Sequence, residues 1–197
     1  MGRPSKFDRE QAIELAMNEI WKNGFEACSV KAISEKLGIT RSSFYNAFES
    51  REALFREALE LYFGRTPDRV LSQADPDTRI IPLLTEMFRD ICRVRAQDAQ
   101  ARGCMAVNCV AELVGVNEPL GPMLENAVLG SVARIQRLLC QAAANSEIED
   151  TGDFRDKALA LQNLLIGLSV MCKVVRCEED LWAVARQTLD GLGLYKE

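Results

Sequence analysis

Hydrophobic residues recur at helical spacing on either side of a break at Gly38. The segment before the break has apolar residues three and four positions apart, at Val30, Ile33 and Leu37. The segment after it has two aromatic residues four apart, at Phe44 and Phe48. Ser29 and Thr40 precede the two segments as N-caps, whose hydroxyls can accept a backbone N–H of the first turn. Glycine tolerates the positive φ of a tight turn, so the pattern predicts two short helices joined at Gly38.

The second predicted helix has a polar face opposite its aromatic face. This face carries side chains that can pair with base edges: Arg41, Ser42, Tyr45 and Asn46. A helix, a tight turn with glycine and a second helix with a polar outward face are the layout of a helix-turn-helix. In that motif the second helix enters the major groove of DNA. The pattern therefore predicts a DNA-reading unit.

The segment from about residue 7 to residue 63 resembles the DNA-binding domain of TetR-family transcriptional regulators. The resemblance is carried by these matching residues: Gly24, Phe25, Ser29, Val30, Ile33, Leu37, Gly38, Ile39, Ser43, Phe44, Tyr45, Phe48, Arg51, Glu52, Leu54 and Phe55. One departure is Arg51, where the family usually has Lys; both are cations at a helix start, so contact with a phosphate should survive with altered geometry. The resemblance implies a three-helix DNA-binding domain over residues 1–63, followed by a helical ligand-binding and dimerisation bundle over residues 64–197.

The expected DNA contacts come from the helix-turn-helix and from a basic arm at the N-terminus. They are Arg3, Lys6, Ser29, Lys31, Thr40, Arg41, Ser42, Ser43, Tyr45, Asn46 and Arg51. The arm resembles the flexible hooks that place an Arg in the minor groove, although a chain terminus can also be basic without binding DNA. The formal net charge is −5, yet residues 1–56 hold nine Lys or Arg against eight Asp or Glu. The acidic balance therefore falls on the rest of the chain, which we expect to bind a ligand or a partner.

Beyond residue 63 the apolar periodicity predicts an all-α protein. Gly64 to Pro67 interrupts the pattern as a hinge between domains, and helices are predicted over residues 78–97, 104–114, 120–144, 154–175 and 179–192. The helix over 154–175 is apolar nearly all round and must be covered on several sides. In the resembled family the last two main helices pair with those of a second subunit, which implies a homodimer through this helix and either its neighbour or the helix over residues 179–192. A buried monomer core is the alternative.

The segment from Arg102 to Glu112 is the second place with candidate chemistry. Cys104 is expected at a helix start beside Arg102, two features that favour a reactive thiolate. Cys104, Asn108 and Glu112 follow at four-residue intervals, so they are expected on one face as candidates for effector binding or sensing. The opening resembles that of a family subgroup with an electrophile-sensing cysteine. A small packing residue is the simpler interpretation of Cys104.

Composition narrows the classes of function. The 197 residues include no His, which removes Ser-His-Asp and Cys-His catalysis and His-ligated zinc. The seven Cys form no CxxC pair, and no apolar run or leader pattern suggests a membrane or secretion, so we expect reduced thiols in the cytoplasm. The sequence thus predicts a cytoplasmic repressor, not an enzyme and without metal or cofactor, that leaves a palindromic operator when a small-molecule effector binds. A helical acyl- or lipid-binding carrier and a carboxylate-dependent enzyme are the alternatives from other classes.

Overall fold

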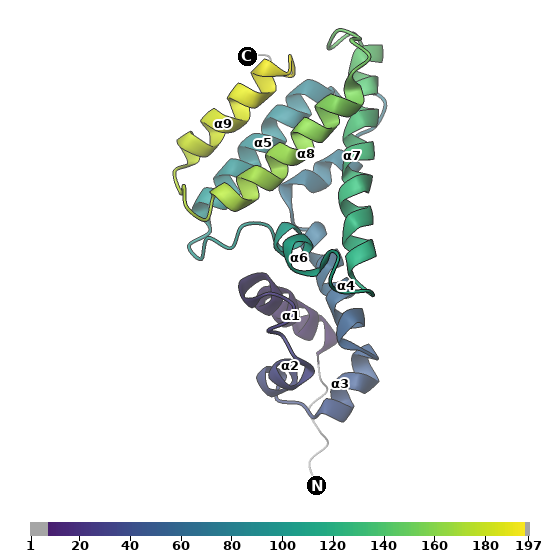
Figure 1. Ribbon diagram of the computed structural model, residues 1–197, viewed down its shortest axis with the longest axis vertical. Coiled ribbons are helices and arrows are strands. Elements are labelled where there is room, and N and C mark those ends of the chain that lie inside the picture. Colours follow the sequence, from purple (N-terminus) through teal and green to yellow (C-terminus); the bar gives the residue numbers. More distant parts are fainter. Residues whose placement is uncertain (1–7, 196–197) are drawn as a thin grey trace.

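The computed structural model describes residues 8–195, which form helices and connecting turns without a strand. Figure 1 shows two stacked parts: residues 9–63 form the lower part, and residues 80–97 and 121–191 form most of the upper part. The predicted all-helical fold is confirmed.

The lower part consists of α1 (Arg9–Asn23), α2 (Val30–Leu37), α3 (Arg41–Phe48) and α4 (Arg51–Phe63). Each helix begins after a residue whose side-chain oxygen accepts a backbone N–H of the first turn: Asp8, Ser29, Thr40 and Ser50. These bonds satisfy donors that have no partner within the helix. The predicted caps Ser29 and Thr40 are therefore confirmed.

The turn between α2 and α3 depends on Gly38. Its backbone is left-handed, with φ +66°, and its N–H donates to carbonyl oxygens in the last turn of α2. Glycine has no Cβ to oppose this conformation, so α2 ends here and the chain turns into α3. The turn joins α2 to α3 at the lower end of the molecule (Figure 1).

The upper part follows a short 3₁₀ helix, η1 (Pro67–Ser72), which the sequence pattern did not predict. It comprises α5 (Ile80–Gln97), α7 (Gly121–Ala144), α8 (Phe154–Met171) and α9 (Glu178–Gly191), with α6 (Met105–Leu113) at the junction of the two parts. α8 ends four residues before its predicted end, because the N–H groups of Lys173 and Val174 bond three residues back in tighter turns. Within residues 8–195, no helix combines the length and the apolar character needed to cross a membrane.

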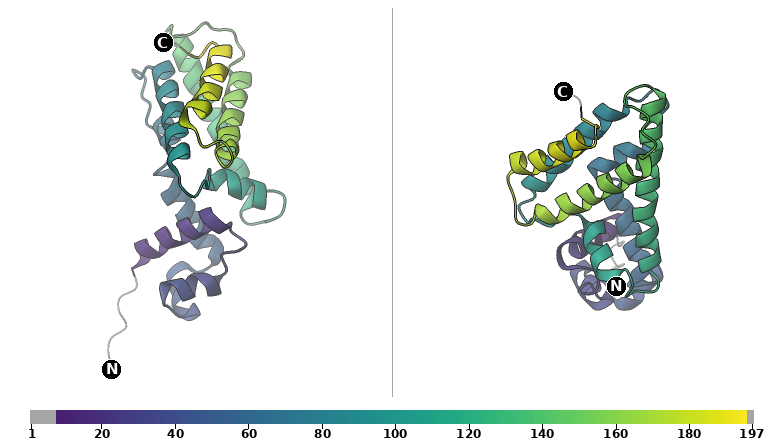
Figure 2. Two further views of the ribbon diagram at one scale, coloured as in Figure 1. Left: turned by 90° about the vertical axis from the view of Figure 1, so that its left-hand side faces the viewer. Right: turned by 45° about the horizontal axis from the view of Figure 1, so that its top comes forward.

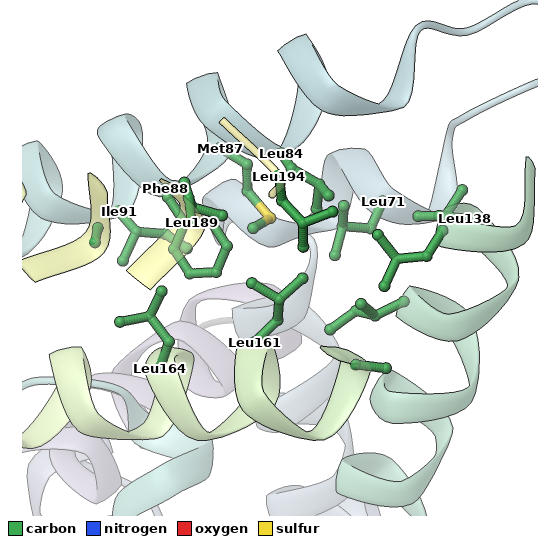
Figure 3. Packing of buried hydrophobic residues seen from close by; sticks show 14 of the residues in the cluster. Leu71, Leu84, Met87, Phe88, Ile91, Leu138, Leu161, Leu164, Leu189 and Leu194 are labelled. Atoms are coloured by element: carbon green, nitrogen blue, oxygen red, sulfur yellow. The ribbon is translucent and has the colours of Figure 1, made fainter. Parts of the chain in front are cut away.

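The protein has two hydrophobic cores, and neither is built from one continuous stretch of the chain. The upper core joins η1, α5, α8, α9 and the second half of α7, and Figure 3 shows its leucines and Phe88 converging from these elements. The lower core joins α1 to α4 but also takes Met105, Cys109 and Leu113 from α6 and Leu120 and Leu124 from the start of α7. α6 therefore packs with the helix-turn-helix part, although it follows α5 in sequence (Figures 1 and 2).

Candidate functional sites: the outward face of α3 and the cavity above α6

The outward face of α3 is open to solvent. Its exposed side chains are Arg41, Ser42, Tyr45 and Asn46. Phe44 and Phe48 occupy the opposite face, with 0% and 1% of their surface exposed. Tyr45 is 51% exposed and lies edge-on to the Phe44 ring, with 5.6 Å between the ring centroids. The buried aromatic pair thus holds the helix so that a polar strip with one arginine faces outward.

The other candidate DNA contacts lie around this strip with part of their polar atoms already engaged. The hydroxyls of Ser29 and Thr40 accept backbone N–H groups as caps, and the Ser43 hydroxyl lies 3.0 Å from that of Thr40. Lys31 is exposed and forms an i,i+4 ion pair of 3.8 Å with Glu35. Such pairs are weak at a surface, so Lys31 remains available to a phosphate.

Arg51 is more enclosed than expected. Its guanidinium carbon lies 4.0 Å from the centre of the Phe25 ring, and Nη2 donates to Glu26 at 3.3 Å. Only 23% of its side chain is exposed. A phosphate contact by Arg51 therefore requires the side chain to share or leave these partners. Arg3 and Lys6 lie outside the described residues.

A cavity of about 250 Å³ lies above α6. Its wall draws on Phe63 at the end of α4, η1, α5, α6, α7 and α8, so it touches both hydrophobic cores. Most lining side chains are apolar; the polar ones are Asp68, Arg95, Cys104, Ser131, Gln162 and Ser169. Residues 8–195 contain no group of three or more His, Cys, Asp or Glu side chains suited to a metal ion. The cavity therefore suits an organic molecule with few polar groups.

Arg95 is the buried cation in the wall of this cavity, with 8% of its surface exposed. Nη1 donates to the carbonyl oxygen of Gly103, and Nη2 donates to the Tyr62 hydroxyl at 3.4 Å. Burial raises the pKa of Tyr62 well above its ordinary value, and Cys104 adds to this. Tyr62 therefore stays protonated, and its neutral hydroxyl accepts the hydrogen bond from Arg95.

Cys104 lies at the expected place but beside a different arginine. It precedes α6, lines the cavity and is partly exposed. Arg102 is held elsewhere: its Nε donates to Asp98 at 3.2 Å, and its guanidinium carbon lies 3.7 Å from the centre of the Trp21 ring. The arginine that shares the cavity wall with Cys104 is Arg95, whereas Arg102, two residues earlier in the chain, does not line this cavity.

Asn108 and Glu112 do not share the cavity with Cys104. The Asn108 amide donates to the carbonyl of Arg102 at 2.9 Å and accepts from Lys173 at 2.8 Å. Glu112 accepts the backbone N–H groups of Phe25 and Glu26, at 2.9 and 2.8 Å. The expectation of one shared effector face is corrected, because α6 presents Cys104 to the cavity and Glu112 to the loop after α1.

α6 is therefore tied to the helix-turn-helix part at both ends. At its C-terminal end Glu112 binds the α1–α2 loop, where Gly24 (φ +83°) leaves room for the carboxylate. At its start the Gly103 carbonyl accepts the Trp21 indole N–H at 3.1 Å. Tyr62 and Arg95 were not predicted from the sequence as residues of this site. Arg95 carried a signal, since it continues the buried stripe of α5 four residues after Ile91.

Comparison with known proteins identifies relatives that share this sequence pattern and this fold. The family described as "Bacterial regulatory proteins, tetR family" matches residues 12–58. The HTH-type transcriptional repressor ComR of Escherichia coli K12 is 27% identical over 189 residues, which cover 95% of this chain and 90% of ComR. A cysteine-substituted variant of the TetR family transcriptional regulator CifR, solved with 26-bp double-strand operator DNA, is 30% identical. It superposes with a TM-score of 0.82, covering 96% of this chain and 98% of CifR.

Escherichia coli NemR, solved in its reduced form, has the same fold: its TM-score is 0.75 at 20% identity, covering 91% of this chain and 95% of NemR. The CifR likeness runs through both parts of the molecule, since it extends over nearly all of each chain. The helix-turn-helix, the exposed polar face of α3 and the likeness to CifR all indicate DNA binding. The chain belongs to the TetR family and is a DNA-binding transcriptional regulator.

Proposed function

We propose that the protein is a cytoplasmic repressor that reads a palindromic operator as a homodimer and leaves it when a small molecule occupies the cavity above α6. The observation that carries the DNA-reading step is the exposed polar strip of α3 above its buried aromatic pair. The repressor ComR and the operator-bound CifR variant support it. The carrier alternative predicted no preferred DNA sequence, and the family assignment counts against it.

Within this proposal the base contacts fall to α3. Arg41 and Asn46 carry donors that suit guanine and adenine edges, and Tyr45 adds an apolar ring with a hydroxyl. The phosphate contacts fall to Ser29, Lys31, Thr40, Ser42, Ser43 and Arg51, and the arm residues Arg3 and Lys6 remain predicted minor-groove contacts. Contacts with phosphates position the domain, whereas contacts with base edges select the sequence.

Selection of binding sites from a random DNA duplex library tests the proposal. The protein should enrich one sequence made of two inverted half-sites whose centres lie about 34–36 Å, or a multiple of this, apart along the DNA. This spacing follows if two reading units are related by a two-fold axis. Enrichment of no sequence would remove the repressor proposal, and a single half-site without a repeat would remove the dimer.

The homodimer is proposed to form through α8 and α9. Leu159, Val170 and Met171 of α8 are 45%, 53% and 38% exposed, and Val184 of α9 is 37% exposed. Large apolar side chains left exposed on these two helices favour an interface with a partner. A dimer through α8 and α9 would hold the two reading units at a fixed distance from each other.

Release of the protein from the operator is proposed to depend on a displacement of α6. α6 forms one wall of the cavity and is bound through Glu112 and Gly103 to the helix-turn-helix part. A ligand that fits the cavity only when α6 is displaced would shift the reading units away from the spacing of the operator. The ligand must bind the displaced arrangement more tightly, since equal affinity for both arrangements shifts nothing.

A thiol sensor is the second candidate, favoured by the position of Cys104, which lines the cavity and is partly exposed at the start of α6. An adduct on Cys104 would fill the cavity covalently, at the start of α6. The other thiols near α6 are poor competitors, because burial raises the pKa of Cys28 to about 11 and that of Cys109 to about 12. At pH 7 such thiols are thiolate in about one molecule in ten thousand or fewer.

Brief alkylation with N-ethylmaleimide at pH 7 tests this candidate. Cys104 should be labelled well before the buried thiols, and the labelled protein should lose operator affinity. Mass-spectrometric mapping and a DNA-binding assay on the same samples provide the two readouts. Raising the pH toward 11 should bring the labelling of Cys28 closer to that of Cys104, because its raised pKa then no longer keeps it protonated.

Two control variants show whether the loss of operator affinity comes from the adduct on Cys104 or from general damage to the protein. Cys104→Ser should keep its operator affinity after treatment, whereas Cys140→Ser, which removes an exposed thiol on α7, should lose affinity like the wild type. If Cys104 is labelled no faster than Cys109, the sensor candidate is abandoned and the cavity remains a reversible site.

A further inference from the structure

We propose that the cavity above α6 selects a small amphipathic anion: one carboxylate, which pairs with Arg95, on an apolar body. This inference rests on the proposed function for its regulatory meaning, but the binding itself stands on the cavity alone. Its starting point is that Arg95 is a buried cation without a counter-ion among residues 8–195.

The charge of Arg95 is poorly compensated. A guanidinium stays protonated in proteins, and only 8% of this residue is exposed. Its hydrogen-bond partners are neutral, namely the Gly103 carbonyl and the Tyr62 hydroxyl, and its Nε has no partner in the described part of the chain. A buried charge without an opposite charge is costly, whereas a carboxylate can take two parallel N–H bonds from a guanidinium. An anion is therefore the ligand group that this wall favours.

The rest of the wall defines the body of the ligand. It is built mainly from aliphatic side chains of four helices, among them Ile91, Val107, Leu124, Val128, Leu165 and Ile166. An apolar cavity of about 150 Å³ can hold benzene, so the 250 Å³ here corresponds to about ten non-hydrogen atoms. A medium-chain or aryl-substituted carboxylate has this size.

One other charged group lies in the wall. Asp68 of η1 is half-buried and would repel a carboxylate placed beside it, so a carboxylate in the cavity is favoured beside Arg95 instead.

Isothermal titration of the full chain, without DNA, tests the inference with three probes of equal chain length: octanoate, 1-octanol and octylamine. Octanoate should bind saturably and at least tenfold more tightly than octanol, and octylamine more weakly than either. Arg95→Met keeps a long side chain without charge and should erase the preference for octanoate. Arg95→Lys keeps the charge and should retain part of it. Cys140→Ser changes an exposed thiol of α7 outside the cavity wall and should leave octanoate binding in place.

Equal affinities for octanoate and octanol in the wild type would overturn the inference, as would undiminished octanoate preference in Arg95→Met. If Arg95→Met does not fold, the wild-type preference and its persistence in Arg95→Lys decide the question. A parallel operator-binding assay keeps the two proposals apart. Octanoate that binds without releasing DNA contradicts the proposed release but not the ligand class. Release by N-ethylmaleimide in a protein that ignores octanoate contradicts the ligand class alone.

Discussion

Phe44→Ala is expected to lower the free energy of unfolding by about 3–5 kcal/mol, the usual cost of truncating a buried aromatic residue. Phe44 has none of its surface exposed and lies 5.4 Å, centroid to centroid, from Phe48 in the core under α3. Removing the ring leaves a cavity where α3 joins the domain. Chemical denaturation followed by far-UV circular dichroism measures the change.

Tyr45→Ala is the matched control, because its ring is on the same helix but half exposed. It should change the unfolding free energy by less than about 1 kcal/mol and weaken operator binding instead. If Phe44→Ala unfolds like the wild type while Tyr45→Ala is strongly destabilised, α3 is rotated and the assignment of its reading face is wrong.

Gly103→Ala is expected to destabilise the protein by about 2–5 kcal/mol, the sum of overpacking and of a left-handed backbone at a residue with Cβ. Gly103 has φ +71°, and an added Cβ would overlap the carbonyl oxygen of Ser169 on α8. Its own carbonyl accepts from Trp21 and Arg95, so a shift there disturbs both the cavity and its link to α1. Denaturant unfolding measures the loss.

Gly115→Ala separates the cost of the left-handed backbone from the cost of overpacking. Gly115 has φ +76°, but an added Cβ would meet nothing within 4 Å. It should therefore cost only the backbone strain, about 1–2 kcal/mol. If both substitutions cost the same, the close approach of Gly103 to α8 does not constrain the fold as described.

The local elements could be predicted from the sequence because their signals are local. Ser29, Thr40 and Ser50 each cap a helix that begins at the next residue, and Gly38 ends α2 where its missing Cβ is needed. The predicted helices in the second half of the chain are present, and η1 alone was missed among the described elements. A 3₁₀ turn of six residues is too short to produce a clear apolar periodicity.

The candidate cavity could not be predicted in the same way, because it depends on how distant segments meet. Residues four apart on α6 were expected to share one site, yet Glu112 binds the loop after α1 and Cys104 faces the cavity. Proximity in sequence favoured Arg102 as the partner of Cys104. The fold instead places Arg102 against Trp21 and Asp98, and brings Arg95 across from α5.

The central claim is that the exposed face of α3 selects a DNA sequence, and the affinity of Arg41→Ala for the selected operator tests it most directly. A good contact to a base edge contributes about 1–3 kcal/mol of discrimination, so the dissociation constant should rise about 5- to 150-fold for the operator. Affinity for a scrambled duplex should change far less. Arg137→Ala removes an exposed arginine of α7 and should bind the operator like the wild type. Equal affinities of the wild type and Arg41→Ala for the operator would contradict the assignment of α3 as the reading helix through this residue.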